Sequence, residues 1–129
     1  MFIDMPPGTG DVPLTVFQSL PIDGIIIVTT PQDLVSMIVK KALGMAKLMK
    51  VPVLGIVENM SYVKCPHCGE EIRIFGESRV EAIAAKENIP VIDRIPIDPV
   101  MTSFMDTGKA EYYEGAFMTG LKDVLPPIE

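Results

Sequence analysis

The chain has 129 residues with a formal net charge of −6, and 48% of them are hydrophobic. A chain of this length and composition forms one domain whose core needs neither disulfides nor a structural metal, and it is too apolar to be disordered. The negative charge excludes a large nucleic-acid surface, because such a surface needs clustered lysine and arginine.

Short apolar runs along the chain predict strands. Residues 1–4 (MFID) have the pattern of a strand end, and residues 24–29 (GIIIVT) and 52–57 (PVLGIV) are continuous apolar runs. Continuous runs of this kind are typical of strands buried on both faces. Residues 91–95 are a shorter candidate for a further strand.

Helical patterns lie between these runs. Asp11 is a candidate cap for a first helix, with Pro13 in its opening turn. The clearest helix is predicted over residues 32–50, where apolar side chains recur at helical spacing. This stripe consists of Leu34, Ile38, Ala42, Met45 and Met49.

The second half of the chain predicts three more helices. Residues 78–81 have the form of a capping box, a short helix begins at Asp98-Pro99, and a last helix covers residues 112–124. Alternation of buried strands with helices predicts an α/β fold with a mostly parallel sheet flanked by helices.

The sequence contains no pattern of a membrane span or a secretory leader. Its longest strictly apolar run, residues 25–28, is far shorter than the roughly 20 residues needed to cross a bilayer. Two cysteines three positions apart suit a metal or redox site in a reducing compartment. We therefore expect a cytoplasmic protein without membrane or nucleic-acid partners.

The opening segment MFIDMPPGTGD combines a carboxylate with a glycine-containing loop. Asp4 would lie at the carboxyl end of a strand, where open α/β sheets bind their ligands. Gly8 and Gly10 would let backbone N–H groups approach an anion closely. The pattern fits a phosphate site, and it also fits a tight loop in which Asp4 only caps the turn.

Cys65-Pro66-His67-Cys68-Gly69 is a second chemical centre. Two thiols at C-x-x-C spacing can face one metal, but a closed site or an iron–sulfur cluster needs about four ligands. A two-fold dimer would bring the count to four. Thiol redox chemistry and a zinc-stabilised loop are the alternatives, although the polar turn after Cys68 differs from the long apolar helix of thioredoxin-like oxidants. We expect His67 to be exposed.

Five motifs resemble those of the Mrp/ApbC family, the ParA- and MinD-like P-loop ATPases that carry iron–sulfur clusters. They follow the family's order and cover essentially the whole chain: DMPPGTGD at 4–11, VTTPQ at 28–32, GIVENMSYVKCPHCG at 55–69, IFGES at 74–78 and RIPIDP at 94–99.

The resemblance implies a role for each matching residue. Asp4 would be the Walker B carboxylate near Mg²⁺, and the N–H of Gly8 would sense the γ-phosphate of ATP. Asn59 would contact the adenine edge, although the spacing alone also fits a turn residue. Pro96 and Ile97 would border the base.

The resemblance also implies partners for the cysteine motif. Cys65 and Cys68 would bridge a [4Fe–4S] cluster across a homodimer, with zinc as a possible substitute. Apo iron–sulfur proteins would receive the cluster.

The family's phosphate loop, G-x-x-x-x-G-K-S/T, is missing from these 129 residues. At the single Gly-Lys pair, Gly108-Lys109, Ser103 replaces the first glycine and Ala110 the hydroxyl residue. Residues 1–129 therefore resemble the C-terminal part of one ATPase domain with a partial P-loop NTPase fold of the MinD-like (SIMIBI) kind.

Within that domain, switch II would lie at 4–11 and a metal-binding loop at 59–76. We expect no ATP hydrolysis by this chain alone. The alternatives are a nucleotide-independent metal-binding or interaction module and, less favoured, a C-x-x-C thiol–disulfide oxidoreductase.

Overall fold

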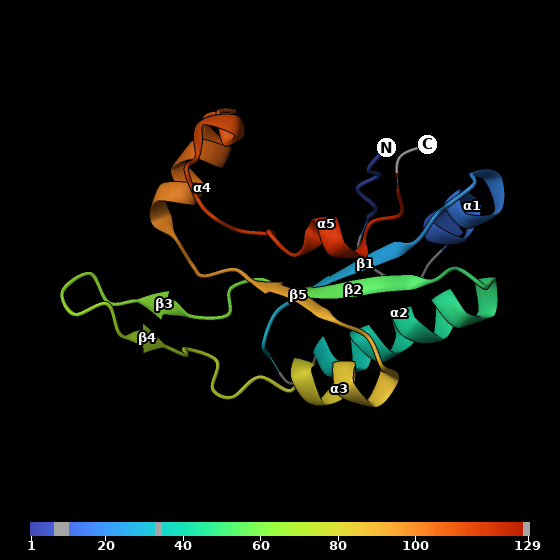
Figure 1. Cartoon of the computed structure of the whole chain (residues 1–129), viewed down its shortest axis with the longest axis horizontal. Coiled ribbons are helices and arrows are strands. Elements are labelled where there is room, and N and C mark those ends of the chain that lie inside the picture. The colour runs from blue at the N-terminus through green and yellow to red at the C-terminus, as the bar shows by residue number, and fades with distance from the viewer. Residues whose placement is uncertain (7–10, 33–34, 128–129) are drawn as a thin grey trace.

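The computed structural model describes residues 1–6, 11–32 and 35–127, and it is built around a parallel sheet (Figure 1). The strands are β1 (Ile25–Thr29), β2 (Val53–Glu58) and β5 (Val91–Arg94), in the order β1-β2-β5. Both neighbouring pairs are parallel. The predicted α/β fold is therefore confirmed, and the three predicted strand regions fall within a residue or two of their observed bounds.

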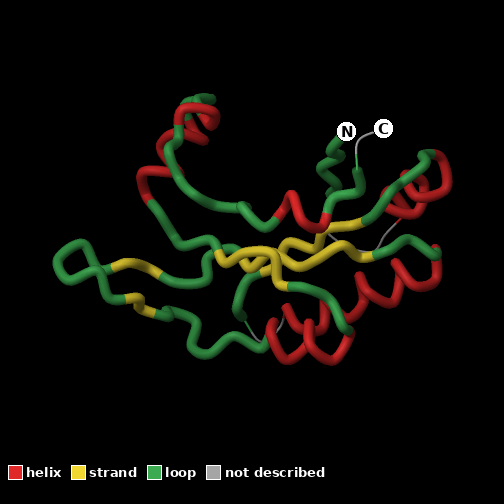
Figure 2. Tube along the Cα trace, viewed as in Figure 1, coloured by secondary structure: helices red, strands yellow, loops and turns green. Residues whose placement is uncertain are grey.

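Helices connect the parallel strands. The helix α2 (Val35–Met49) joins β1 to β2, and α3 (Val80–Glu87) precedes β5. Both lie on one face of the sheet, and the connection from β2 to α3 carries a hairpin that projects away from the sheet (Figure 2). The remaining helices are α1 (Asp11–Ser19), α4 (Pro99–Asp106), the 3₁₀ turn η1 (Ala110–Tyr112) and α5 (Leu121–Val124). None of the helices in the described part of the chain has the length and apolarity needed to cross a bilayer.

The hydrophobic core lies between the sheet and the two helices α2 and α3. Ile56, at the centre of the middle strand, is fully buried, and Ile27 pairs with it in register. Burying an aliphatic side chain of this size stabilises the fold by about 1.5–3 kcal/mol. The buried members of the core are Ile27, Val39, Leu43, Ile56, Val80 and Ala84.

The first strand is covered less completely than its sequence predicts. Val28 is 65% exposed, whereas Val57, its partner in register on β2, is 1% exposed. The prediction that β1 is buried on both faces is therefore wrong. In the described part of the chain β1 is an edge strand, so its outer side has no neighbouring strand to cover it.

Residues 1–6 form neither a helix nor a strand, and Phe2 is 73% exposed. The prediction of a strand end at residues 1–4 is therefore wrong. An extended segment becomes a strand only when a neighbouring strand accepts and donates its backbone hydrogen bonds. No described strand pairs with this segment.

The buried side of α2 differs from the predicted apolar stripe by about one position. Val39, Leu43 and Ala46 face the sheet and are at most 3% exposed, while Ile38 is 53% exposed. These buried positions recur at i, i+4 and i+7, which keeps them on one side of a helix. The predicted stripe runs along the edge of that side. The side chain of Leu34 lies outside the described residues.

One of the predicted helix starts has its expected cap. The side chain of Asp98 accepts a hydrogen bond from the N–H of Val100 at 2.8 Å, which confirms the helix that begins after it. At α3 the cap position is Arg79, which makes no side-chain cap bond, whereas Ser78 Oγ accepts from the N–H of Val80 at 3.1 Å and Glu81 pairs with Arg94. The predicted capping box over residues 78–81 is therefore wrong. The side chain of Asp11, proposed as the first cap, lies outside the described residues.

The prediction of a last helix over residues 112–124 is wrong. Helical turns remain only at η1 and α5, and the chain between them is irregular. The Asp93 side chain accepts a hydrogen bond from the N–H of Met118, whose φ of 60° is left-handed. Two glycines in this stretch, at 115 and 120, also disfavour a helix.

Candidate functional site

The two cysteines lie in the turn of the projecting hairpin. Its strands, β3 (Val63–Lys64) and β4 (Glu71–Ile72), are antiparallel and only two residues long each. The N–H of Cys65 donates to the carbonyl of Glu70 at 2.9 Å, and the N–H of Gly69 donates back to the carbonyl of Cys65 at 2.9 Å. Gly69 has a φ of 75°, which an L side chain would strain. The glycine therefore permits the turn that presents the thiols.

Backbone N–H groups are directed at one of the sulfur atoms. The N–H of Cys68 and then that of His67 hydrogen-bond to the Cys65 thiol and, with the Cys68 side chain, hold the pKa of Cys65 below its usual range. Donors aimed at sulfur favour the thiolate, which is the form that binds metals. Cys65 is half-buried and Cys68 exposed, and both are free thiols. His67 is exposed, as predicted.

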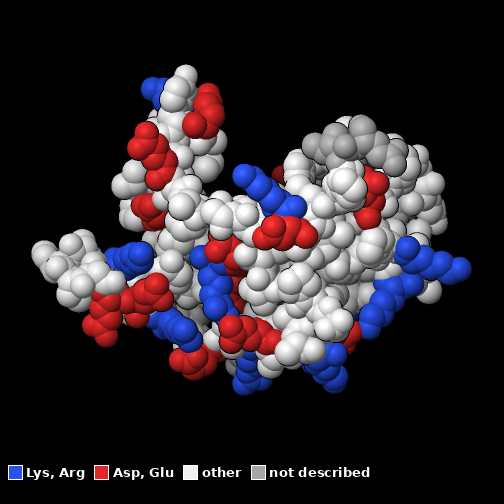
Figure 3. Space-filling model, viewed as in Figure 1, with Lys and Arg blue, Asp and Glu red and all other residues white. Residues whose placement is uncertain are grey.

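The tip of the hairpin carries no Lys, Arg, Asp or Glu side chain from Cys65 to Gly69, and it forms an uncharged protrusion at the left of Figure 3. Among the described residues, no group of three or more His, Cys, Asp or Glu side chains is placed to hold a metal ion. The thiols of one chain therefore fit half of a four-thiolate site, and they would need two further ligands from elsewhere.

The predicted base-contacting residues come together at the carboxyl edge of the sheet. Asn59 directly follows β2, and its N–H donates to the carbonyl of Thr29 at 2.7 Å. The N–H of Ile97 donates to the carbonyl of Tyr62 at 2.8 Å, which joins the segment after β5 to the one after β2. Pro96 is buried, and Asn59 and Ile97 are half-buried. Parallel sheets bind ligands at this edge.

The phosphate side of the predicted site is not assembled in the same way. Asp4 is exposed and follows no strand. Gly8 lies outside the described residues. Asp4 was expected at the carboxyl end of a buried strand. That placement is wrong, because residues 1–6 do not form a strand.

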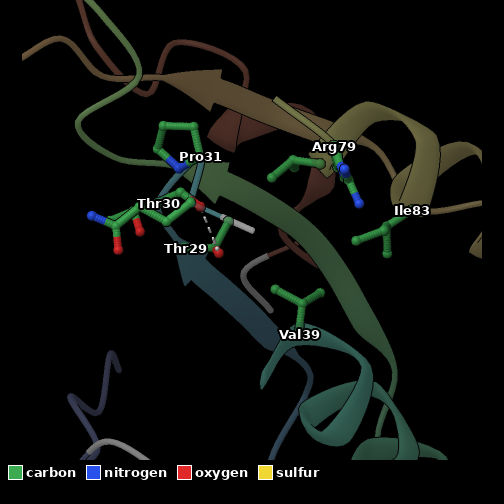
Figure 4. Close-up of a pocket in the computed structure, with 8 residues that line it drawn as sticks. Thr29, Thr30, Pro31, Val39, Arg79 and Ile83 are labelled. Atoms are coloured by element: carbon green, nitrogen blue, oxygen red, sulfur yellow. Dashed lines mark hydrogen bonds between the residues drawn. The ribbon is translucent and has the colours of Figure 1, made fainter. Parts of the chain in front are cut away.

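A small hollow lies where β1 ends, between α2 and α3. Thr29, Thr30 and Pro31 line it from the strand end, and Val39 and Ile83 from the helices (Figure 4). Its space of about 10 Å³ holds at most one water molecule. The hollow is therefore too small for a nucleotide base.

Sequence reasoning missed a buried carboxylate at the end of β2. Glu58 is 1% exposed, and its two oxygens accept hydrogen bonds from the hydroxyls of Ser61 and Ser78. Arg94 Nε lies 3.8 Å from Glu58 Oε1. The available signal was a charged residue that ends the apolar run GIVE without a break.

Comparisons with known proteins agree with this geometry. A family model described as a ParA-type NUBPL iron-transfer P-loop NTPase matches residues 1–123. The iron–sulfur cluster carrier protein of Clostridium perfringens is 49% identical over 113 residues, which are 88% of this chain and 39% of that relative. The protein of the same name from Pyrococcus abyssi is 51% identical over 108 residues, or 84% of this chain and 37% of that relative.

A solved structure also resembles this chain closely. It is a nucleotide-binding protein from Archaeoglobus fulgidus in complex with ADP, with a TM-score of 0.80 and 44% sequence identity. The match covers 97% of this chain and 50% of that one. The chain thus spans half or less of the length of these relatives. On the family model, the identities and the shared fold, the chain belongs to the Mrp/ApbC family of ParA-type P-loop NTPases, whose matched relatives are named iron–sulfur cluster carrier proteins.

Proposed function

We propose that this chain is the cluster-binding part of an iron–sulfur cluster carrier, in which two copies share one [4Fe–4S] cluster between their cysteine turns. The observation that supports this most directly is the turn itself. It presents Cys65 and Cys68 at the tip of a projecting hairpin, where backbone N–H groups lower the pKa of the Cys65 thiol. Each chain supplies two thiolates, and a two-fold axis doubles any patch that lies on it.

The cluster is the cargo in this proposal, and apo iron–sulfur proteins are its recipients. An exposed, uncharged tip allows two copies to approach without like-charge repulsion, and it allows a recipient's thiols to reach the metal. The proposed location is the cytoplasm, where thiols stay reduced.

The proposal includes a nucleotide site at the carboxyl edge of the sheet. Asn59 would hydrogen-bond the adenine edge, because an amide both donates and accepts. Pro96 and Ile97 would pack against the base. Asp4 would hold Mg²⁺ through water and Gly8 would donate its N–H to the γ-phosphate, which would neutralise and orient the triphosphate.

We further propose that residues 1–129 are the C-terminal part of one ATPase domain, with switch II at 4–11 and the metal-binding loop at 59–76. The 129 residues contain no phosphate-loop motif, so they lack its backbone donors and its lysine. The chain by itself is therefore expected to bind ATP weakly and not to hydrolyse it.

The test is anaerobic reconstitution with iron and sulfide, followed by visible absorption and iron analysis. The proposal predicts a brown protein with about two irons per chain, since four irons are shared by two chains. Cys65→Ser and Cys68→Ser should each abolish the colour. His67→Ala is the matched control, because this exposed residue lies between the two thiols, and it should keep the colour.

Two other outcomes would overturn the proposal. A colourless protein that takes up zinc but no cluster would support a structural zinc loop. A reversible disulfide between Cys65 and Cys68, with neither metal bound, would support thiol redox chemistry.

A further inference from the structure

The hairpin that carries the cysteines has little structure of its own. Each of its strands is two residues long, and residues 66–77 are all exposed. An isolated two-stranded hairpin is at best marginally stable in water. The position of the thiols therefore depends on how the two legs of the hairpin are attached to the sheet.

Both legs meet at one carboxylate. Ser61 begins the first leg and Ser78 ends the second, and the hydroxyls of both donate to Glu58, one to each carboxylate oxygen. The first leg has additional attachments, because the N–H of Ser61 donates to the carbonyl of Ile95 at 2.9 Å. The second leg is attached through the bond from Ser78 to Glu58 and through α3, which begins two residues later with the buried Val80.

The surroundings of Glu58 fix this carboxylate firmly. It is 1% exposed at the end of the middle strand, and its own carbonyl accepts a hydrogen bond from the N–H of Ile95 at 2.8 Å. A buried carboxylate is costly unless hydrogen bonds and a positive charge satisfy it. Arg94 supplies that charge from the neighbouring strand and also pairs with Glu81 on α3.

We propose that Glu58 is the positioning residue of the cysteine turn. One buried carboxylate fastens both legs of the hairpin to the end of β2, and it thereby sets where Cys65 and Cys68 lie relative to the sheet. That this turn holds a cluster rests on the proposed function, but the attachment of the hairpin to Glu58 does not. Since the first leg keeps its backbone bonds, the loss of the Ser78 hydroxyl should free the hairpin more than the loss of the Ser61 hydroxyl.

The test measures the position of the turn directly and without metal. Nitroxide labels are placed on Cys65 and on a cysteine introduced by Lys41→Cys, an exposed site on α2, in a chain that carries Cys68→Ser. Pulsed electron resonance then gives the distribution of distances between the two labels. Ser78→Ala and Glu58→Met, which keeps the side-chain length but cannot bond the serine hydroxyls, should make this distribution roughly twofold wider, because the second leg loses its bond to residue 58.

The matched variants separate positioning from general stability. Ser78→Thr keeps the hydroxyl and should restore the narrow distribution, and Ser103→Ala, an exposed serine on α4, should leave it unchanged. Ser61→Ala should widen the distribution less than Ser78→Ala. Equal widths in the parent chain, Ser78→Ala and Glu58→Met would overturn the proposal, as would failure of Ser78→Thr to restore the parent width.

The outcome does not depend on whether the chain carries a cluster. If the unmodified chain, with both Cys65 and Cys68, binds no iron–sulfur cluster on reconstitution, the proposed function fails while the distance distributions still decide the role of Glu58. If the chain binds a cluster and the distributions do not change, the role of Glu58 fails alone. Should Glu58→Met not fold, the comparison of Ser78→Ala with Ser78→Thr decides.

Discussion

Replacing Val57 or Val28 by alanine tests whether one face of the sheet is covered better over the central strand β2 than over the edge strand β1. The two valines are partners in register on adjacent strands, so their side chains point to the same face. Val57 is 1% exposed and Val28 is 65% exposed. The two sites therefore differ in burial, while valine-to-alanine changes the side chain and the strand propensity equally at both.

The expected loss of stability follows from the buried surface. Valine to alanine removes two methyl groups, worth about 1.6 kcal/mol when both are fully buried, and an unfilled cavity adds to this. We expect Val57→Ala to lower the free energy of unfolding by about 1.5–3 kcal/mol. At Val28 about a third of the surface is buried, which gives a loss of about 0.5 kcal/mol.

Urea unfolding followed by far-ultraviolet circular dichroism measures both values, and the chain has no tryptophan to follow by fluorescence. The midpoint should fall clearly for Val57→Ala and little for Val28→Ala, at unchanged slope. Equal losses would refute the reasoning, because they would mean that Val28 on β1 is as well covered as Val57 on β2.

Three further predictions concern local structure. Gly44→Ala, in the exposed part of α2 with open space around the new Cβ, should raise the free energy of unfolding by about 0.5–1 kcal/mol. Gly69→Ala, at a φ of 75°, should lower it by about 1 kcal/mol. Urea midpoints measure both changes, and a shift in the same direction for both variants would contradict the turn geometry. The hydroxyl of Tyr113, followed by the N–H of Val100, holds the pKa of Asp98 below 3.8, so the stability from Asp98 is complete above pH 3.8 and is lost as the pH falls through the lower folded pKa. Tyr113→Phe should raise the pKa of Asp98 in a carboxyl titration by nuclear magnetic resonance, and an unchanged value would mean that the hydroxyl has no part in it. In a Cys68→Ser chain, backbone N–H groups should still hold the pKa of Cys65 low, so alkylation should begin at a lower pH in the folded chain than in urea; the same pH profile in both would contradict this.

Much of the fold was predictable because the signals were local. A continuous β-branched run marks β1, a largely apolar run marks β2, and Asp98 before a proline marks the start of α4. The family resemblance, now shown, rested on motifs such as the one around Cys65. Each of these features depends on residues within a few positions of one another.

The features that failed depend on contacts between distant parts of the chain. The irregular stretch before α5 is held by the distant Asp93, whose side chain accepts a hydrogen bond from the N–H of Met118. The attachment at Glu58 involves the hydroxyls of Ser61 and Ser78, which lie 3 and 20 positions further along the chain. No sequence pattern of serines indicates which carboxylate they bind. Val57 is buried and Val28 is not, because among the described strands β2 has a neighbour on both sides and β1 on one side.

The most direct test of the proposed function is the mass of the metal-loaded protein. Native mass spectrometry of the reconstituted chain should show one [4Fe–4S] cluster per two chains, and single chains without cluster when Cys65 is replaced by serine. A cluster or metal ion bound with full occupancy to single chains would contradict the account, since each chain would then complete the site without a partner.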